Sequence, residues 1–261
     1  MGDGLNPAFD ATLLSRIEDA GLNASAPPQQ RWLDGWLVRF SPGKAKRARC
    51  VNAVATGRMP VAERLAACAT VFAEAQLPMI VRITPFTLPA ALDALLEREG
   101  LERFDDTRVM VSAVTPAPAA PAPTGTVVHP IGLEGFAQRV GSWRGSPLAQ
   151  RQAHAERLLN SPVPFSAFEL HADGQPVACG QIAIEGDVVG LYDVFTAEAA
   201  RGHGHAKLLC RQLLHAARLR GARHAYLQVE ADNQPARAVY RSLGFVDAYA
   251  YHYRARNPSA A

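Results

Sequence analysis

Cysteine is scarce in this sequence, and none of its cysteines has the spacing of a metal site. The 261 residues include four cysteines, Cys50, Cys68, Cys179 and Cys210, and no C-x-x-C pair. This pattern excludes a small disulfide-built scaffold and a cysteine-ligated zinc site. It is typical of a reducing compartment, so we expect a cytoplasmic protein.

Long apolar runs and a strong net charge are also missing. No apolar stretch approaches the roughly 20 residues that span a bilayer, and no basic segment followed by an apolar one opens the chain. Lys+Arg 27 against Asp+Glu 24 gives a net charge of +3. So small an excess indicates neither a nucleic-acid partner nor a membrane partner. The basic run Lys44, Lys46, Arg47 and Arg49 is interpreted as a solvated hairpin or loop.

A proline- and alanine-rich segment divides the sequence. Residues 115–124 contain four prolines and four alanines, a composition that can form neither a helix nor a strand ladder. We expect this segment to be an extended linker between a domain of residues 1–114 and a domain of residues 125–261. The apolar content of 48% is sufficient for a hydrophobic core.

The second half alternates between strand and helix patterns. The predicted elements are a strand near 127–128, helices over 133–140 and 150–159, strands over 165–171, 177–184 and 188–196, a helix over 204–219, a strand over 225–230, a helix over 235–243 and a last strand through 249–253. This order predicts an α/β fold with a mixed, mostly antiparallel twisted sheet and helices on both faces.

The first half repeats part of this order. The predicted elements are a helix over 11–20 closed by Gly21, a hairpin carrying Trp32 and Trp36, a helix over 61–74, a strand over 79–83, a helix over 88–99 and a strand over 108–114. Gly100-Leu101 follows its last helix as Gly244-Phe245 follows the corresponding helix of the second half. The sequence therefore predicts a tandem repeat whose first copy has lost its ligand chemistry.

A turn at residues 201–206 carries the clearest functional signal. The strand that ends at Thr196 leads into the glycine-containing turn Arg201-Gly202-His203-Gly204, and a helix follows directly. Free amides at a helix start, approached closely past glycine, bind anions such as phosphate. A dinucleotide fingerprint is excluded because Lys207 occupies its third glycine position. We expect no metal at this turn, since no carboxylate cluster supports its two histidines.

Residues 189–245 resemble the acetyl-coenzyme A binding region of the GNAT superfamily of N-acetyltransferases. The signature R-x-x-G-x-[G/A] is met by Arg201, Gly204 and Ala206. A second signature, about 30 residues on, is met by Asn233, Ala236, Tyr240 and Leu243-Gly244-Phe245. The resemblance covers residues 125–261 and reaches residues 1–114 only through the faint repeat.

The resemblance implies acetyl-CoA as co-substrate and no metal. Amides of residues 202–206 would hold the pyrophosphate, and residues 194–196 would hydrogen-bond the pantetheine arm, one of their amides polarising the thioester carbonyl. Asn233 would contact the pantetheine or cap the following helix. The residues so implied at the cofactor are Val194, Phe195, Thr196, Arg201, Gly202, His203, Gly204, His205, Ala206, Asn233 and Tyr240.

Three residues are candidates for proton transfer. Tyr240 either packs on the core face of its helix or protonates the departing thiolate. Glu230 is the first candidate for a general base and Asp193 the second, and a water relay is an equal alternative. Strand alternation predicts that Asp193 shares a face with Leu191.

The expected reaction is direct transfer of an acetyl group to a primary amine of a small molecule or peptide, by a monomer or a homodimer. The alternative is an acyl-CoA-binding sensor or assembly module without catalysis. Trp143 and Arg144 lie where the family builds its acceptor rim. The tyrosines at 249, 251 and 253 either form an aromatic wall for the acceptor or pack against the first half.

Overall fold

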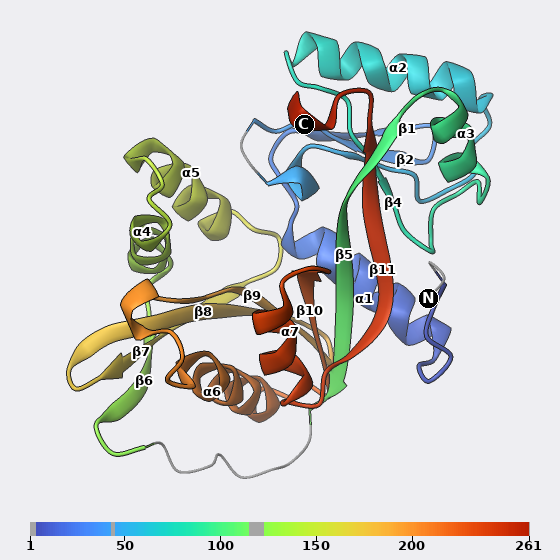
Figure 1. Cartoon of the computed structure of the whole chain (residues 1–261). Coiled ribbons are helices and arrows are strands. Elements are labelled where there is room, and N and C mark those ends of the chain that lie inside the picture. The colour runs from blue at the N-terminus through green and yellow to red at the C-terminus, as the bar shows by residue number, and fades with distance from the viewer. Residues whose placement is uncertain (1–3, 43–44, 115–122, 261) are drawn as a thin grey trace. The chain divides into compact units, whose positions relative to one another are not determined.

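The computed structural model describes residues 4–42, 45–114 and 123–260 (Figure 1). Lys44 and most of the predicted linker, residues 115–122, lie outside these ranges. The chain forms two compact units. The first contains Met1–Arg16, Ser25–Val109 and Asp247–Ala261, and the second contains Ile17–Ala24 and Met110–Val246.

The first unit is built on strands ordered β1-β2-β3-β4-β11-β5. Its elements are the start of α1 (Ala11–Ala24), β1 (Gln30–Leu33), β2 (Trp36–Arg39), β3 (Val51–Asn52), α2 (Val61–Glu74), β4 (Val81–Ile83), α3 (Leu92–Arg98), most of β5 (Glu102–Ala113) and β11 (Val246–Ala255). β3 and β4 are parallel, because α2 connects them. Trp36, Phe72 and Leu96 are among the fully buried side chains of its core.

The second unit continues from Met110 of β5, with strands ordered β5-β10-β9-β8-β7-β6. Its further elements are β6 (Thr126–Ile131), α4 (Leu133–Trp143), α5 (Leu148–Leu159), β7 (Phe165–Ala172), β8 (Gln175–Glu185), β9 (Val188–Thr196), α6 (His205–Leu219), β10 (His224–Glu230) and α7 (Gln234–Arg241). β6 to β9 pair antiparallel, and β9 pairs parallel with β10.

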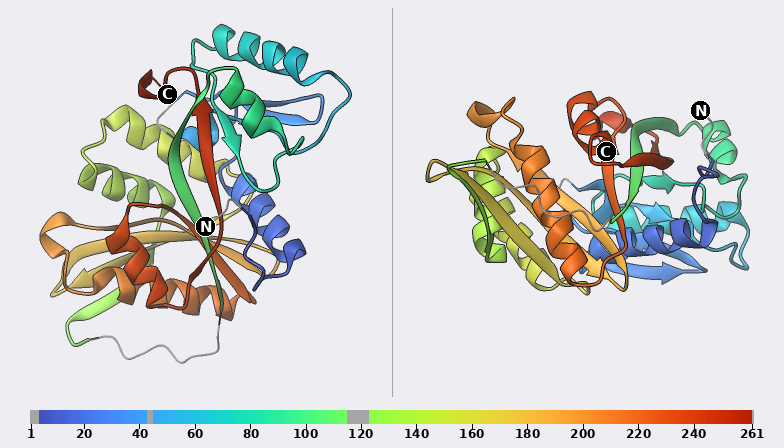
Figure 2. Two further views of the ribbon diagram at one scale, coloured as in Figure 1. Left: turned by 45° about the vertical axis from the view of Figure 1, so that its right-hand side comes forward. Right: turned by 90° about the horizontal axis from the view of Figure 1, so that it is seen from below.

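Helices cover both faces of the sheet of the second unit, as expected (Figure 2). Leu209 and Leu213 of α6 pack on one face against residues such as Leu191. Phe136 of α4 and Leu158 of α5 pack on the other face. Consecutive side chains of β9 therefore point to opposite faces of the sheet, one toward α6 and the next toward α4 and α5.

The two units share one order of elements. β1-β2-β3-α2-β4-α3-β5 in the first part of the chain corresponds to β7-β8-β9-α6-β10-α7-β11 in the second. In both series the third and fourth strands are parallel and joined through a helix. The tandem mixed α/β fold predicted from the sequence is therefore confirmed.

The unit boundaries differ from the predicted domains 1–114 and 125–261. β11 belongs to the first unit because it pairs antiparallel with β4, Tyr253 lying opposite Arg82. The second half of α1 belongs to the second unit, where Ala24 joins the core under α4 and α5. The last strand of the second series, β11, is thus packed with the first series, a property that local sequence patterns do not encode.

Placement of β11 in the first unit also decides between the two interpretations of its tyrosines. Tyr249, Tyr251 and Tyr253 are buried. Tyr249 packs edge-on against Phe86, and the Arg82 guanidinium lies 3.9 Å from the Tyr251 ring centroid. They pack against the first half and do not form a free aromatic wall. Among the described residues no helix is long and apolar enough to cross a membrane.

Candidate functional site

β9 and β10 separate part-way along their length. The parallel pairing runs from Val188 to Gly190 of β9. Beyond this point no strand in the part of the chain that the structure describes pairs with the edge of β9 that faces β10. A bulge follows in β9, where Asp193 and Val194 together lie opposite Gly180 of β8. Asp193 has a φ of +48°, a conformation that aspartate tolerates better than most residues. The result is an open strand edge from Leu191 to Thr196.

The open edge includes the segment predicted to hold the pantetheine arm. The Ala197 amide donates to Val177 O of β8 at 2.9 Å, so Phe195 is also turned toward β8. Alternation along the strand turns the amides of Val194 and Thr196 toward the open edge. An extended ligand could pair there as an added strand.

The turn after β9 exposes an unbroken row of amides. None of the backbone amides from Gly202 to Lys207 donates a hydrogen bond to any residue that the structure describes, and the first helical bond is from Leu208 N to Gly204 O at 3.0 Å. Gly202 and Gly204 have φ of +83° and +79°, with open space where a side chain would begin. α6 starts at His205 and adds the positive end of its dipole. Unpaired amides at a helix start have the geometry suited to binding an anion.

Aromatic and cationic side chains surround Phe195. Trp143, at the end of α4, stacks on Phe195 with ring centroids 6.1 Å apart and an interplanar angle of 23°. The guanidinium groups of Arg144 and Arg201 lie 5.4 and 5.8 Å from the Phe195 ring centroid. The predicted rim residues thus contact the predicted cofactor strand directly.

Asp193 is held in an ionic network. Its Oδ1 accepts a 2.9 Å hydrogen bond from Arg144 Nη1, and its Oδ2 accepts one of 2.9 Å from Gln181 Nε2. His154 Nε2 lies 3.4 Å from the same Oδ2. Although burial opposes ionisation, the neighbouring His154 and the Arg144 guanidinium hold the Asp193 pKa well below its usual range. So acidic a group is a poor proton acceptor, which argues against the second candidate for the base.

The predicted face of Asp193 is corrected by the structure. Leu191 enters the core under α6, whereas Asp193 meets Arg144 of the α4 end and His154 of α5 on the opposite face. The bulge and the positive φ reverse the expected alternation at this position. Gln181 and His154 were missed as site residues for the same reason, because a bulge has no reliable signature in the sequence.

Glu230 lies beyond the point where β9 and β10 separate, and Tyr192 and Tyr226 lie beside that point. Glu230 is exposed at the end of β10. Leu227 and Val229 enter the core under α6, so Tyr226, Gln228 and Glu230 occupy the other face. The hydroxyls of Tyr192 and Tyr226 are hydrogen-bonded to each other where the strands part. Sequence reasoning did not single out this pair.

Tyr240 and Asn233 belong to α7. Tyr240 packs beside Phe245, with ring centroids 6.1 Å apart, and borders the core under α6. Its hydroxyl has no hydrogen-bond partner among the described residues, and burial raises its pKa above the ordinary value. Asn233 Oδ1 accepts a 3.2 Å hydrogen bond from the Ala236 amide, so Asn233 caps α7.

Residues 14–254 match the family described as "Probable histone acetyltransferase Rv0428c C-terminal". The match covers most of the chain. The chain belongs to this family. It is a GNAT superfamily N-acetyltransferase, in agreement with the resemblance carried by the turn at residues 201–206.

Similar proteins carry related names. YobR of Bacillus subtilis (strain 168), named as an uncharacterized N-acetyltransferase, is 23% identical over 232 residues, which are 86% of this chain and 91% of YobR. The mycothiol acetyltransferase of Nocardioides sp. is 33% identical over 189 residues, 61% of this chain and 63% of the relative.

Solved structures show the same fold. A GCN5-related N-acetyltransferase from Kribbella flavida superposes with a TM-score of 0.67 at 18% identity, covering 94% of this chain and 95% of that one. A tandem GNAT protein from the clavulanic acid biosynthesis pathway has a TM-score of 0.61 at 14% identity, covering 76% and 70%.

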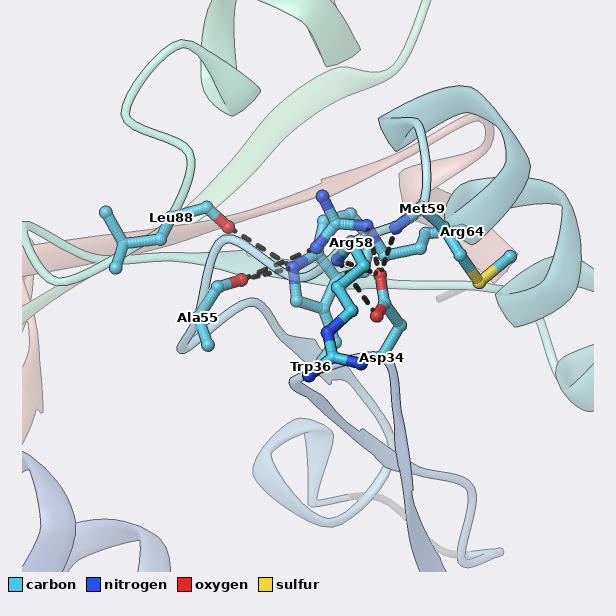
Figure 3. A network of polar contacts seen from close by, with 7 residues as sticks. All are labelled: Asp34, Trp36, Ala55, Arg58, Met59, Arg64 and Leu88. Carbon is cyan, nitrogen blue, oxygen red and sulfur yellow. Dashed lines mark hydrogen bonds and ion pairs between the residues drawn. The ribbon is translucent and has the colours of Figure 1, made fainter.

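The first GNAT-like unit has a different arrangement at the corresponding turn, between β3 and α2 (Figure 3). The Asp34 carboxylate accepts hydrogen bonds from the amides of Arg58, at 2.8 and 2.9 Å, and Met59, at 2.7 Å. Arg64 Nε lies 3.5 Å from the same carboxylate, and the Arg64 guanidinium covers the buried Trp36 ring at 4.4 Å. Amides that would face a phosphate are thus occupied by the protein's own carboxylate.

A glycine permits this close approach. Gly57 has a φ of +72°, and a Cβ there would come within 2.4 Å of the Asp34 carboxylate. The absence of an R-x-x-G-x-[G/A] turn in the first half predicted lost ligand chemistry. The structure adds the residue that takes the place of an anion.

Proposed function

We propose that this N-acetyltransferase transfers an acetyl group from acetyl-CoA directly to a primary amine, at the second unit. The observation that carries the proposal is the row of unoccupied amides from Gly202 to Lys207 beside the open edge of β9. A helix start of this kind suits a pyrophosphate, and an open strand edge suits the amide-containing pantetheine arm. Arg201 adds a fixed positive charge next to the turn.

In the proposed complex the β9 edge also activates the thioester. The amides of Val194 and Thr196 point to the open edge, and one of them polarises the carbonyl oxygen as negative charge develops on it. A preorganised donor of this type contributes roughly 10²–10³-fold to the rate. Phe195, under Trp143, keeps the strand in place.

Direct transfer is favoured over a covalent enzyme intermediate. All four cysteines are buried. Burial raises the pKa of Cys68 to about 11 and that of Cys179 and Cys210 to about 12, and it raises the pKa of Cys50 as well. A buried thiol with a raised pKa is a poor nucleophile. The acceptor amine therefore attacks the thioester itself.

Tyr240 is proposed as the acid that protonates the departing CoA thiolate. Its raised pKa keeps the hydroxyl protonated, and that hydroxyl is not used by another described residue. The neutral amine needed for attack is scarce, since about one lysine-like amine in a thousand is neutral near pH 7. Glu230, directly or through water, is the proposed proton acceptor, because the ion pair with Arg144 makes Asp193 a weak base.

The acceptor is proposed to enter over the surface formed by Trp143, Arg144 and Phe195. The family description names a histone, and relatives are named for mycothiol, so both peptide and small-molecule amines are candidates.

The test is a screen of acetyl-CoA with a library of amines, comprising polyamines, aminoglycosides, amino sugars, peptide N-termini and lysine peptides. Release of CoASH is followed with a thiol reagent, and the acetylated product is identified by mass spectrometry. Tyr240→Phe should lower kcat by about 10²–10⁴-fold and leave the CoASH Kd unchanged. CoASH binding without amine-dependent turnover would instead support the acyl-CoA sensor, and absence of CoASH binding would remove both functions.

A further inference from the structure

Two histidines and a glutamate meet on β6 and β7 of the second unit. His129 lies directly opposite Glu169 in the antiparallel pair, and His171 follows Glu169 by two residues on the same face. One side-chain donor atom from each of His129, Glu169 and His171 lies within 4.8 Å of the other two. Pairing of these strands therefore brings together three potential metal ligands, although His129 and His171 are 42 residues apart in the sequence.

The carboxylate is oriented by its surroundings. Glu169 Oε2 accepts a 2.7 Å hydrogen bond from Arg139 Nε of α4, while Oε1 lies 2.5 Å from His171 Nε2. The Glu169 side chain is only 6% exposed, and its pKa is lowered by His171 and Arg139 despite its burial. One oxygen is thus fixed by Arg139, and the other is directed to His171.

His129 supplies an unused donor atom. Its Nδ1 is shielded from solvent and has no hydrogen-bond partner among the described residues. The His129 and His171 rings meet edge to face with centroids 4.5 Å apart. A buried, unpaired imidazole nitrogen carries a free-energy cost that a metal bond would remove.

We propose that His129, Glu169 and His171 bind a divalent transition-metal ion of the zinc type. Two imidazoles and one carboxylate form a donor set typical of zinc, with bonds of about 2.0–2.2 Å. Ligand atoms around a tetrahedral ion lie about 3.3 Å apart, so a small opening of the His171–Glu169 contact admits the ion. Three protein ligands leave one coordination position for water. Arg139 then acts on the ligand carboxylate from outside the coordination sphere.

Zinc binding is measured by calorimetry on the untagged, EDTA-treated full chain, and cobalt(II) is added as a spectroscopic probe. The expected result is one ion per chain and the visible bands of tetrahedral cobalt. Loss of a group that only hydrogen-bonds a metal ligand weakens metal binding roughly 10–100-fold. His171→Ala and His129→Ala each remove a ligand, so each should weaken zinc binding by at least that factor. Circular dichroism and CoASH binding verify that each variant is folded.

Two controls separate this site from other histidines. His224, 4.0 Å from Asp187, offers one histidine and one carboxylate, so His224→Ala should leave the zinc Kd unchanged. The rings of His203 and His205 lie 5.8 Å apart at the turn of residues 201–206. A variant with both histidines replaced by alanine reports any zinc held there. Absence of zinc heat, binding that persists in His171→Ala, or binding lost only in the His203/His205 variant would overturn the proposal. None of these readouts uses acetyl transfer, so they are independent of the proposed enzyme activity.

Discussion

The Met59 amide donates a 2.7 Å hydrogen bond to the Asp34 carboxylate at the turn that precedes α2. In the corresponding turn before α6, the amides from Gly202 to Lys207 have no partner among the described residues. One fold element thus occurs twice in the chain, once closed by an internal anion and once open. The difference lies in side chains, since both turns join a strand to a helix between parallel strands.

The first prediction is that one molecule of CoASH binds per chain. Asp34 occupies the amides of Arg58 and Met59 and denies them to a phosphate, so calorimetry should give a stoichiometry near one. Asp34→Ala should lower the melting temperature, because two amides and Arg64 lose their partner, and should leave the CoASH Kd unchanged. Two sites per wild-type chain would contradict this interpretation of the turn.

The Asp34 carboxylate should also make the stability of the protein depend on pH in the acidic range. Hydrogen bonds from the Met59 and Arg58 amides lower the Asp34 pKa below its ordinary value. A lowered pKa in the folded state means that the contribution to stability is complete above the unfolded-state pKa and is lost as the pH falls through the folded-state pKa. Wild type and Asp34→Ala should therefore converge in melting temperature below about pH 4.

A second prediction concerns Gly204, which has a φ of +79° at the start of α6. Gly204→Ala places a Cβ in the open space where the proposed pyrophosphate lies, and it adds roughly 1–2 kcal/mol of backbone strain. CoASH affinity should fall by at least about tenfold. Gly221→Ala is the matched control, because Gly221 has a φ of +93°, is also surrounded by open space and lies after the other end of α6. Equal loss of affinity in both variants would show that strain alone is responsible.

Local patterns in the sequence predicted much of the second unit. α6 and β9 follow from apolar periodicity. The glycine turn at residues 201–206 follows from glycine spacing, because backbone conformation at 202 and 204 depends on those residues themselves. α2 was predicted with its observed bounds, Val61–Glu74. These are features in which near neighbours in the chain decide the structure.

Features that depend on distant residues were not predicted. Gly21 was expected to end a helix, but α1 continues to Ala24, and Gly21 instead allows Gln228 to approach to 2.9 Å from the position of a Cβ. The two-residue strand β3 is too short for a periodic signal. The role of Asp34 depends on a hairpin and a turn more than 20 residues apart, which only the folded sheet brings together.

The third prediction separates two carboxylates of the second unit. Asp193→Asn removes the charge that faces Arg144 and should destabilise the protein by about 1.5–3 kcal/mol, the typical value for a charged hydrogen bond. It should leave the pH dependence of kcat/KM unchanged, because a group with so low a pKa does not titrate near neutrality.

Glu230→Gln should give the opposite pattern. Glu230 is exposed, so the free energy of unfolding, measured with urea, should change by less than about 0.5 kcal/mol. If Glu230 accepts the amine proton, kcat/KM falls by about 10²–10⁴-fold. A wild-type kcat/KM in Glu230→Gln would favour the water relay instead.

The fourth prediction concerns the pH dependence of the first unit. His252 is 2% exposed, and its Nε2 lies 3.0 Å from Asp93 Oδ1, which also accepts a 2.7 Å hydrogen bond from Arg254 Nε. Burial lowers the His252 pKa more than the Asp93 carboxylate raises it, and the charges of Arg103 and Arg254 lower it further. At the pH where His252 of the unfolded chain begins to protonate, His252 of the folded protein is therefore still neutral.

A lowered histidine pKa makes the unfolded state the better proton acceptor, so stability falls as the pH drops below about 6.5. The slope contributed by one such group is at most about 1.4 kcal/mol per pH unit. His252→Gln, which can still donate to Asp93, should flatten the stability profile between pH 6.5 and pH 5, a window measured by urea unfolding. The His205 pKa is also lowered, by its own partial burial and by His203, so His205→Gln measures the contribution of the second unit. A profile that His252→Gln leaves as steep as wild type would contradict the lowered His252 pKa, because a group with the same pKa in both states contributes no slope.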